Sequence, residues 1–216
     1  MRFSLALAMG MLTVATAVNA QTSAAGKEPD RGYVEAVAES AFGNVTSQSF
    51  GAEVGVTVRP DLQVFGSFGK IRDVATTEIG TSAQTIALAL AQLQTGAVSY
   101  SVKEPVTFIV GGVRYRIPST SMLKPYILGG VGVATVTKDV KFLIDGAEAS
   151  SSLAQYVTVG TDISGDETKL MFTLGGGVVW PAWRQLIVDL QYQYGRIFTD
   201  TAITVNRVGI GVGVRF

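Results

Sequence analysis

Apolar and polar side chains alternate along parts of this chain with a period of two residues. The segments 48–59 and 185–197 show this alternation, and it is clearest in 202–216. In that last segment, arginine and glycine residues alternate with an apolar row: Val208, Ile210, Val212, Val214 and Phe216. A period of two over ten or more residues is typical of a strand with two different faces, because helical side chains repeat every 3.6 residues.

Eight segments of this chain have the length of a tilted strand that crosses a bilayer, which takes about 9–11 residues. They are 32–42, 48–59, 62–72, 105–117, 124–137, 169–180, 185–197 and 202–216. The mean hydropathy of +0.34 is high for a soluble domain, yet no apolar run long enough for a membrane helix follows the N-terminal region. These observations predict an all-β fold: an eight-stranded antiparallel up-and-down transmembrane β-barrel with apolar faces outward.

The N-terminal region predicts an export signal. Arg2 precedes an apolar stretch from Leu5 to Val18, and the small residue Ala20 follows. A basic start, an apolar centre and a small-residue cleavage site are typical of a signal peptide. We therefore expect a signal peptide at 1–20, a short periplasmic lead-in at 21–31 and the barrel at 32–216.

The connections between the segments are unequal in length. Short ones fall at 60–61, 118–123 and 181–184, and the two long ones, 73–104 and 138–168, fall on the opposite side. The connections 43–47 and 198–201 are also short, but by parity they fall on the side of the long ones. Bacterial outer-membrane barrels have short periplasmic turns and longer extracellular loops. This pattern predicts the bacterial outer membrane, with periplasmic termini and extracellular long loops.

Aromatic residues gather near the ends of the segments, as in the interfacial belts of membrane barrels. On the short-turn side, the predicted belt consists of Tyr115, Tyr126, Trp180, Trp183 and Phe216. On the loop side, it consists of Phe42, Phe50, Tyr194 and Phe198.

Over roughly 32–216, the chain resembles the small eight-stranded outer-membrane barrels of the opacity-protein and OmpA/OmpX type. The terminal strand, with its final phenylalanine, and the preceding 190–196 carry the resemblance. In that family, the barrel-assembly machinery reads the C-terminal aromatic strand. The resemblance therefore implies an assembly signal made of Val208, Ile210, Val212, Val214 and Phe216. It also implies contact with outer-membrane lipid and lipopolysaccharide, but no particular activity, because one fold serves many functions.

Charged residues on the polar faces are predicted to line the lumen. They are Glu35, Glu39, Glu53, Asp189, Arg114, Arg116, Arg207 and Arg215. Antiparallel pairing places Glu39, Glu53, Asp189 and Arg207 in one layer at mid-depth, which has too many acids for one cation. Either Arg114 or another base reaches in, or the pKa of one carboxylate is raised.

An eight-stranded barrel has an interior just wide enough for side chains, and buried charges must be paired. A lumen plugged by this charged network is therefore favoured. A narrow path for ions or small solutes through the same network is the alternative.

The two long loops differ in composition. In 73–104, the pattern from Thr81 to Gln84 resembles a capping box and predicts a helix over 85–95 that ends at Gly96. Its apolar face would consist of Ile86, Ala89, Leu90 and Leu93. The helix would pack on the barrel rim, dock a partner or lie at the membrane surface; alternatively, part of 85–103 extends the fourth strand. The loop 138–168 is rich in small polar residues and is expected to be solvated, with acids too irregular for a calcium loop.

Composition narrows the function classes. The chain has no histidine and no cysteine, which excludes histidine-based catalysis, zinc–thiolate sites and disulfides. The formal net charge of zero argues against a nucleic-acid partner. We expect no catalytic, cofactor or metal site.

The favoured interpretation is a non-enzymatic structural or surface-interaction barrel whose loops contact an extracellular partner. A carboxylate-only enzyme stays formally open. A soluble carrier resembling lipocalins also stays open, because alternation alone does not say which face is inside.

Overall fold

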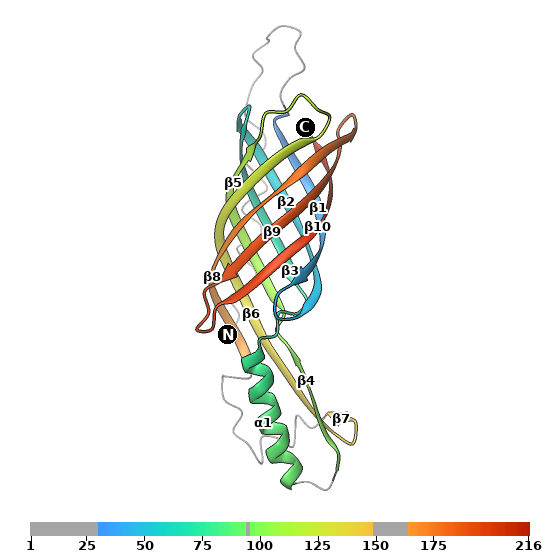
Figure 1. The fold of residues 1–216 in the computed structure, drawn as a ribbon, viewed down its shortest axis with the longest axis vertical. Helices are drawn as coiled ribbons and strands as arrows, with labels where there is room; N and C mark the ends of the chain where they lie inside the picture. Colours follow the sequence, from blue (N-terminus) through green and yellow to red (C-terminus); the bar gives the residue numbers. More distant parts are fainter. Residues whose placement is uncertain (1–29, 94–95, 149–163) are drawn as a thin grey trace, which may run out of the picture.

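The computed structural model describes residues 30–93, 96–148 and 164–216, and their strands form one antiparallel sheet that closes into a barrel (Figure 1). Each ring strand pairs with the next along the chain, β6 pairs with β8, and β10 pairs with β1 to close the ring. The eight ring strands are β1 (Gly32–Phe42), β2 (Thr46–Arg59), β3 (Leu62–Ile71), β5 (Val106–Arg116), β6 (Lys124–Ile144), β8 (Ser164–Trp183), β9 (Leu186–Ile197) and β10 (Ile203–Arg215). This confirms the predicted eight-stranded up-and-down barrel.

The two ends of the barrel differ. The short-turn end carries only short connections, together with the first described residue, Asp30, and Phe216 at the C-terminus. The other end, called here the platform end, carries the two long connections as well as the short ones between β1 and β2 and between β9 and β10, and it points down in Figure 1. The predicted signal peptide and most of the predicted lead-in lie outside the described residues.

Strands β6 and β8 continue well beyond the ring at the platform end. They are 21 and 20 residues long, and β7 (Ala147–Glu148) pairs with the end of β6. The predicted loop over 138–168 is therefore strand at 138–144 and 164–168, although Gly165, Asp166 and Thr168 are exposed as expected of a solvated segment. Its central part, 149–163, lies outside the described residues. Along β6, Val136 and Phe142 are buried on the same face, so the strand alternation persists past the predicted end.

The connection between β3 and β5 contains a helix and a further strand. Helix α1 (Thr77–Leu93) begins eight residues before the predicted start, and the Thr76 hydroxyl accepts a bond from the Ile79 N–H at 3.5 Å. Strand β4 (Val98–Lys103) pairs with the end of β6. Part of 85–103 is thus a strand just before β5, as the alternative interpretation had it.

Helix α1 packs against the strands beyond the ring, and together with β4 and 139–144 it forms what we call the helix platform. Its buried face consists of Ile79, Ala83, Ala87 and Leu90. Of the predicted face, Leu90 is buried and Ile86 packs against this core, whereas Ala89 and Leu93 are exposed. The face that packs against Phe142 includes the small side chains of Ala83 and Ala87, which the prediction had not assigned to it. Among the described residues, no helix is long and apolar enough to span a membrane.

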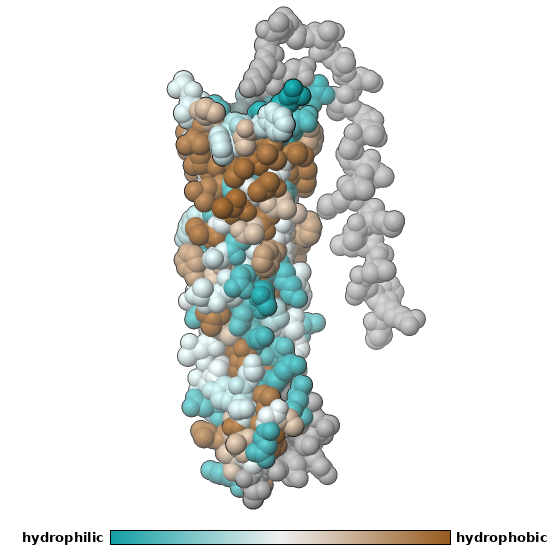
Figure 2. All heavy atoms as spheres, turned by 90° about the vertical axis from the view of Figure 1, so that its right-hand side faces the viewer, coloured by the Kyte–Doolittle hydropathy of each residue, from teal (hydrophilic) through white to brown (hydrophobic). Residues whose placement is uncertain are grey.

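The barrel presents apolar side chains outward. Ile210 and Leu190 are 52% and 60% exposed, whereas Glu35 and Asp189 are almost completely buried. Figure 2 shows apolar residues in a band near the short-turn end, with a mixed surface toward the platform. An apolar exterior over a charged interior is the opposite of a soluble carrier, whose exterior is polar.

Four of the five aromatic residues predicted for the short-turn belt are exposed on the outside: Tyr115, Trp180, Trp183 and Phe216. Tyr126 is not, because its side chain is 2% exposed and points into the lumen. Its neighbour Ile127 faces outward instead. The segment 124–137 has apolar residues on both faces, so the side on which Tyr126 falls was not readable from alternation. At the loop side, Phe42, Phe50 and Phe198 are exposed and Tyr194 is partly buried.

Candidate functional site: the lumen and its mouth

Arg114 is the centre of the first buried charge layer. It comes from β5 and is 1% exposed. Its Nη2 lies 2.8 Å from Asp189, 3.2 Å from Glu53 and 3.5 Å from Glu35. The acids come from β9, β2 and β1, so this arginine links strands from across the barrel.

Two tyrosines enclose the Arg114 guanidinium. Its carbon lies 3.7 Å from the ring centroid of Tyr126 and 4.6 Å from that of Tyr33, which are cation–π distances. The Tyr33 hydroxyl donates to Glu53 at 2.6 Å, and the Tyr126 hydroxyl donates to Asp189 at 2.7 Å. Each tyrosine therefore stabilises both the cation and one of its acids.

Glycines make room for the tyrosines. A Cβ on Gly55 would overlap the Tyr33 ring, and one on Gly177 would lie 2.6 Å from the Tyr126 oxygen. Only residues without a side chain allow the rings to lie against the barrel wall here.

Arg207 is the centre of a second layer, nearer the platform end. Its Nη1 lies 3.0 Å from Glu39, and its Nη2 donates to Gln193 at 2.5 Å. Ser49 donates to the same Glu39 oxygen at 3.0 Å. The guanidinium also lies 4.6 Å from the ring of Phe108.

The predicted single layer of Glu39, Glu53, Asp189 and Arg207 is wrong. Glu39 pairs in register with Ser49, and Glu53 pairs with Glu35, because Phe42 already pairs with Thr46 across a tight turn. Arg207 pairs with Gln193 and Asp189 pairs with Gly211. The acids are thus divided between two layers, each with its own arginine.

Two of the predicted lumen arginines lie at the short-turn mouth instead. Arg116 is half-buried and its Nη2 donates to the Thr57 hydroxyl at 3.4 Å. Arg215 forms an ion pair with Asp30 at 3.0 Å and donates to the Arg184 carbonyl. Both end their strands, where the lumen already opens.

A third layer, which sequence reasoning missed, is apolar. It begins at Phe108 and fills the ring toward the platform with buried side chains, among them Ile71, Val106, Val136, Met171, Ile197, Ile203 and Val205. The alternation of Val106, Phe108 and Val110 was visible, but the opposite face of β5 is apolar as well, so the lumen side was ambiguous.

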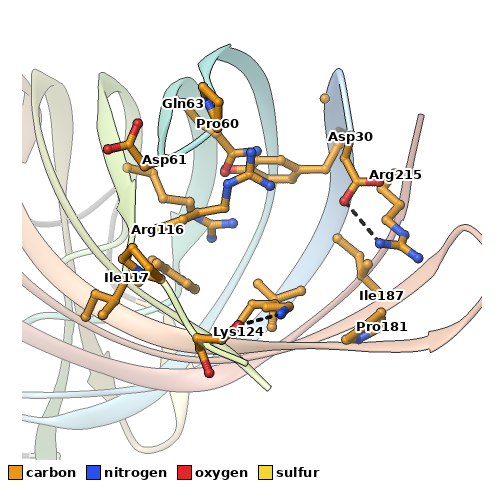
Figure 3. Close-up of a pocket in the computed structure, with 17 residues that line it drawn as sticks. Asp30, Pro60, Asp61, Gln63, Arg116, Ile117, Lys124, Pro181, Ile187 and Arg215 are labelled. Carbon is orange, nitrogen blue, oxygen red and sulfur yellow. Dashed lines mark hydrogen bonds and ion pairs between the residues drawn. The ribbon is translucent and has the colours of Figure 1, made fainter. Parts of the chain in front are cut away.

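Cavities lie at both ends of the packed interior. At the short-turn end, a cavity of about 420 Å³ opens above Arg114; it is called here the mouth pocket (Figure 3). At the platform end, a second cavity of about 210 Å³ lies beside Glu78, which accepts a hydrogen bond from Thr201. Between them, the void beside Arg207 measures only about 10 Å³.

Among the described residues, no group of acidic side chains is arranged to hold a metal ion. The lumen acids are instead directed at the two arginines. Chemically, the described interior consists of two arginines with four acids around them, two tyrosine rings beside Arg114, and an apolar layer.

Comparison with known structures places this architecture among small membrane barrels. Neisserial surface protein A is 14% identical with a TM-score of 0.53, over 86% of this chain and 96% of that one. A major outer membrane protein from Thermus thermophilus is 12% identical with a TM-score of 0.53, over 86% of this chain and 99% of that one. At these identities the likeness shows the fold alone. No curated protein matches the chain.

The sequence itself matches one family over nearly its whole length. Residues 4–216 match the family described as the outer membrane protein beta-barrel domain. The eight-stranded ring, its apolar exterior and its charged interior agree with that match. The chain therefore belongs to the outer-membrane β-barrel family.

Proposed function

We propose that this protein is a closed, non-enzymatic barrel that anchors in the bacterial outer membrane and presents the helix platform at the cell surface. In this proposal the short-turn end, with the termini, faces the periplasm. Lipid and lipopolysaccharide surround the apolar band. A partner outside the cell would contact the platform.

The packed interior is the observation that carries the proposal. Arg114 binds carboxylates from three strands, and Arg207 binds one carboxylate. An apolar layer fills the lumen on the platform side of Arg207. An ion on its way through would have to displace paired charges and then cross a dry layer, and both steps are costly.

The non-enzymatic part of the proposal is supported by the chemistry of the chain. It has no histidine or cysteine. The carboxylates that stand close together, Glu35, Glu53 and Asp189, are all buried against Arg114. A general acid or base must be able to contact a substrate, and these buried carboxylates contact Arg114.

Conductance in planar bilayers tests the closed lumen. We expect no steady single-channel current from the protein. A variant with Phe108, Met171 and Ile197 replaced by alanine should pass small currents if the apolar layer is the seal. Steady, size-dependent conductance of the unmodified protein would overturn the proposal.

A narrow channel is the second candidate, because cavities approach the packed interior from both ends. In that case the Arg207–Glu39 pair would have to open during conduction. Conductance that rises in Glu39→Gln would favour the channel, whereas the closed barrel stays silent in both forms.

Single cysteines test the orientation, because the chain has none of its own. Gln84 lies on the exposed side of α1, and Thr120 lies on an exposed short turn, so the two variants are Gln84→Cys and Thr120→Cys. In intact cells, a membrane-impermeant maleimide should label the first and not the second. The reverse pattern would contradict the proposed orientation.

A further inference from the structure

The mouth pocket is a second feature of the lumen, separate from its packed interior. Its volume of about 420 Å³ is within the range of small-molecule pockets, about 300–1,000 Å³. The floor is formed by Arg114 and the rings of Tyr33 and Tyr126, and Figure 3 shows Arg116, Lys124 and Arg215 around the opening.

The cations of the pocket differ in how their charges are used. Arg114 already faces three carboxylates, and Arg215 is paired with Asp30. Arg116 lines the pocket and has no carboxylate within salt-bridge distance in the described part of the chain. Its side chain donates a long bond to Thr57, while its Nε is buried without a partner among the described residues. The other N–H groups of the Arg116 guanidinium are therefore available to a ligand.

The rest of the wall is largely apolar. Ile117, Val179 and Ile187 line it, together with prolines of the short turns. A few polar groups converging on an apolar concavity are typical of sites for small molecules. The wall suits a flat or compact hydrocarbon body, and Arg116 suits its anionic head.

The charges nearby decide which anion is favoured. The Arg114 layer holds three carboxyl groups against one guanidinium, and Asp30 and Asp61 lie at the pocket itself. A doubly charged phosphate would be repelled by these acids more strongly than a singly charged carboxylate. Arginine binds carboxylates through two parallel hydrogen bonds.

We propose that the mouth pocket binds a small organic carboxylate with an apolar body, and that Arg116 holds the carboxylate. The proposal does not depend on whether the lumen conducts. It assigns a ligand site to the short-turn end, whereas the proposed surface role concerns the platform end.

Binding of 2-naphthoate tests the proposal, with the full barrel in phospholipid nanodiscs and the probe followed by its fluorescence. We expect saturable binding of 2-naphthoate, weaker binding of 2-naphthyl phosphate and none of the neutral 2-naphthamide. Arg116→Gln should weaken the binding by about ten-fold or more, the effect of losing a charge-assisted hydrogen bond. Arg116→Lys should be intermediate.

Arg59→Gln is the matched control, because Arg59 is an exposed arginine at the same end of the barrel but outside the pocket. It should bind like the unmodified protein, and heat-modifiable migration on a gel reports whether each variant is folded. Equal binding of 2-naphthamide, or unchanged binding in folded Arg116→Gln, would overturn the proposal. So would a signal no larger than that of empty nanodiscs.

Discussion

The hydroxyl of Tyr126 donates a 2.7 Å hydrogen bond to Asp189 inside the barrel. The two residues come from β6 and β9, which are not neighbours in the sheet, so the bond spans the lumen. Because the ring also lies against Arg114, one side chain joins the cation and its acid.

Removing this hydroxyl should destabilise the barrel. Tyr126→Phe keeps the ring on Arg114 but takes a donor from a buried carboxylate, so the free energy of unfolding should fall by about 1.5–3 kcal/mol. Urea unfolding followed by the fluorescence of Trp180 and Trp183 measures it. Tyr115→Phe, on the outer surface, should change stability by less than about 0.5 kcal/mol. Equal effects would contradict the assigned bond.

Arg114 should be the most sensitive position of the lumen. Arg114→Gln leaves Glu35, Glu53 and Asp189 without their cation, and breaking a buried pair costs about 3–5 kcal/mol. Equilibrium unfolding in detergent micelles is the measurement. Adding Glu35→Gln and Glu53→Gln to the variant should recover part of the loss, because fewer charges then stay unpaired. A triple variant less stable than Arg114→Gln alone would contradict the network.

The glycine opposite Tyr33 should not tolerate a side chain. A methyl group on Gly55 would overlap the Tyr33 ring, so Gly55→Ala should cost about 1–3 kcal/mol through displacement of that ring. Gly66→Ala is the control, because no atom lies within 4 Å of the position its Cβ would take. The temperature at which each variant loses its folded migration on a gel compares the two. Similar temperatures would count against this packing.

The helix platform should unfold independently of the ring. Leu90 is 1% exposed between α1 and the strands, and Leu90→Ala should destabilise the platform by about 2–5 kcal/mol. The rate of amide hydrogen exchange should rise in 77–93, while the unfolding transition of the barrel stays unchanged. Leu93→Ala, at a position 63% exposed, should leave the exchange unaltered. A lowered barrel transition in Leu90→Ala would show that the two parts unfold together.

Phe216 should matter for assembly in cells more than for stability. Its ring is 57% exposed, while its backbone N–H and carbonyl bond to Gly32 and do not need the ring. Phe216→Ala should therefore refold in micelles but accumulate less in the outer membrane, as the family resemblance implies. Phe198→Ala, exposed at the opposite end, should accumulate normally. Immunoblots of outer-membrane fractions compare them.

The periodicity of the chain specifies strands and separates the two faces of the best-patterned ones. In β2, β9 and β10, one side is apolar and the other carries charges, and a one-residue slip would put every charge into the apolar surroundings. Local alternation therefore puts Glu53, Asp189 and Arg207 on the face opposite the apolar one, and the expected lipid around the apolar face turns these charges inward, where they are buried.

Which charges meet depends on how strands far apart in the chain are brought together. Glu35, and not Glu39, lies opposite Glu53 in the strand register, because the turn after Phe42 is tight. That Arg114 reaches acids of β1, β2 and β9 depends on closure of the ring, a relationship among residues far apart in the chain. The outward position predicted for Tyr126 was likewise wrong, because both faces of its strand are apolar and local alternation does not choose between them. Where the alternation is clear, it specifies a face; register and closure specify the neighbours, and these depend on the whole sheet.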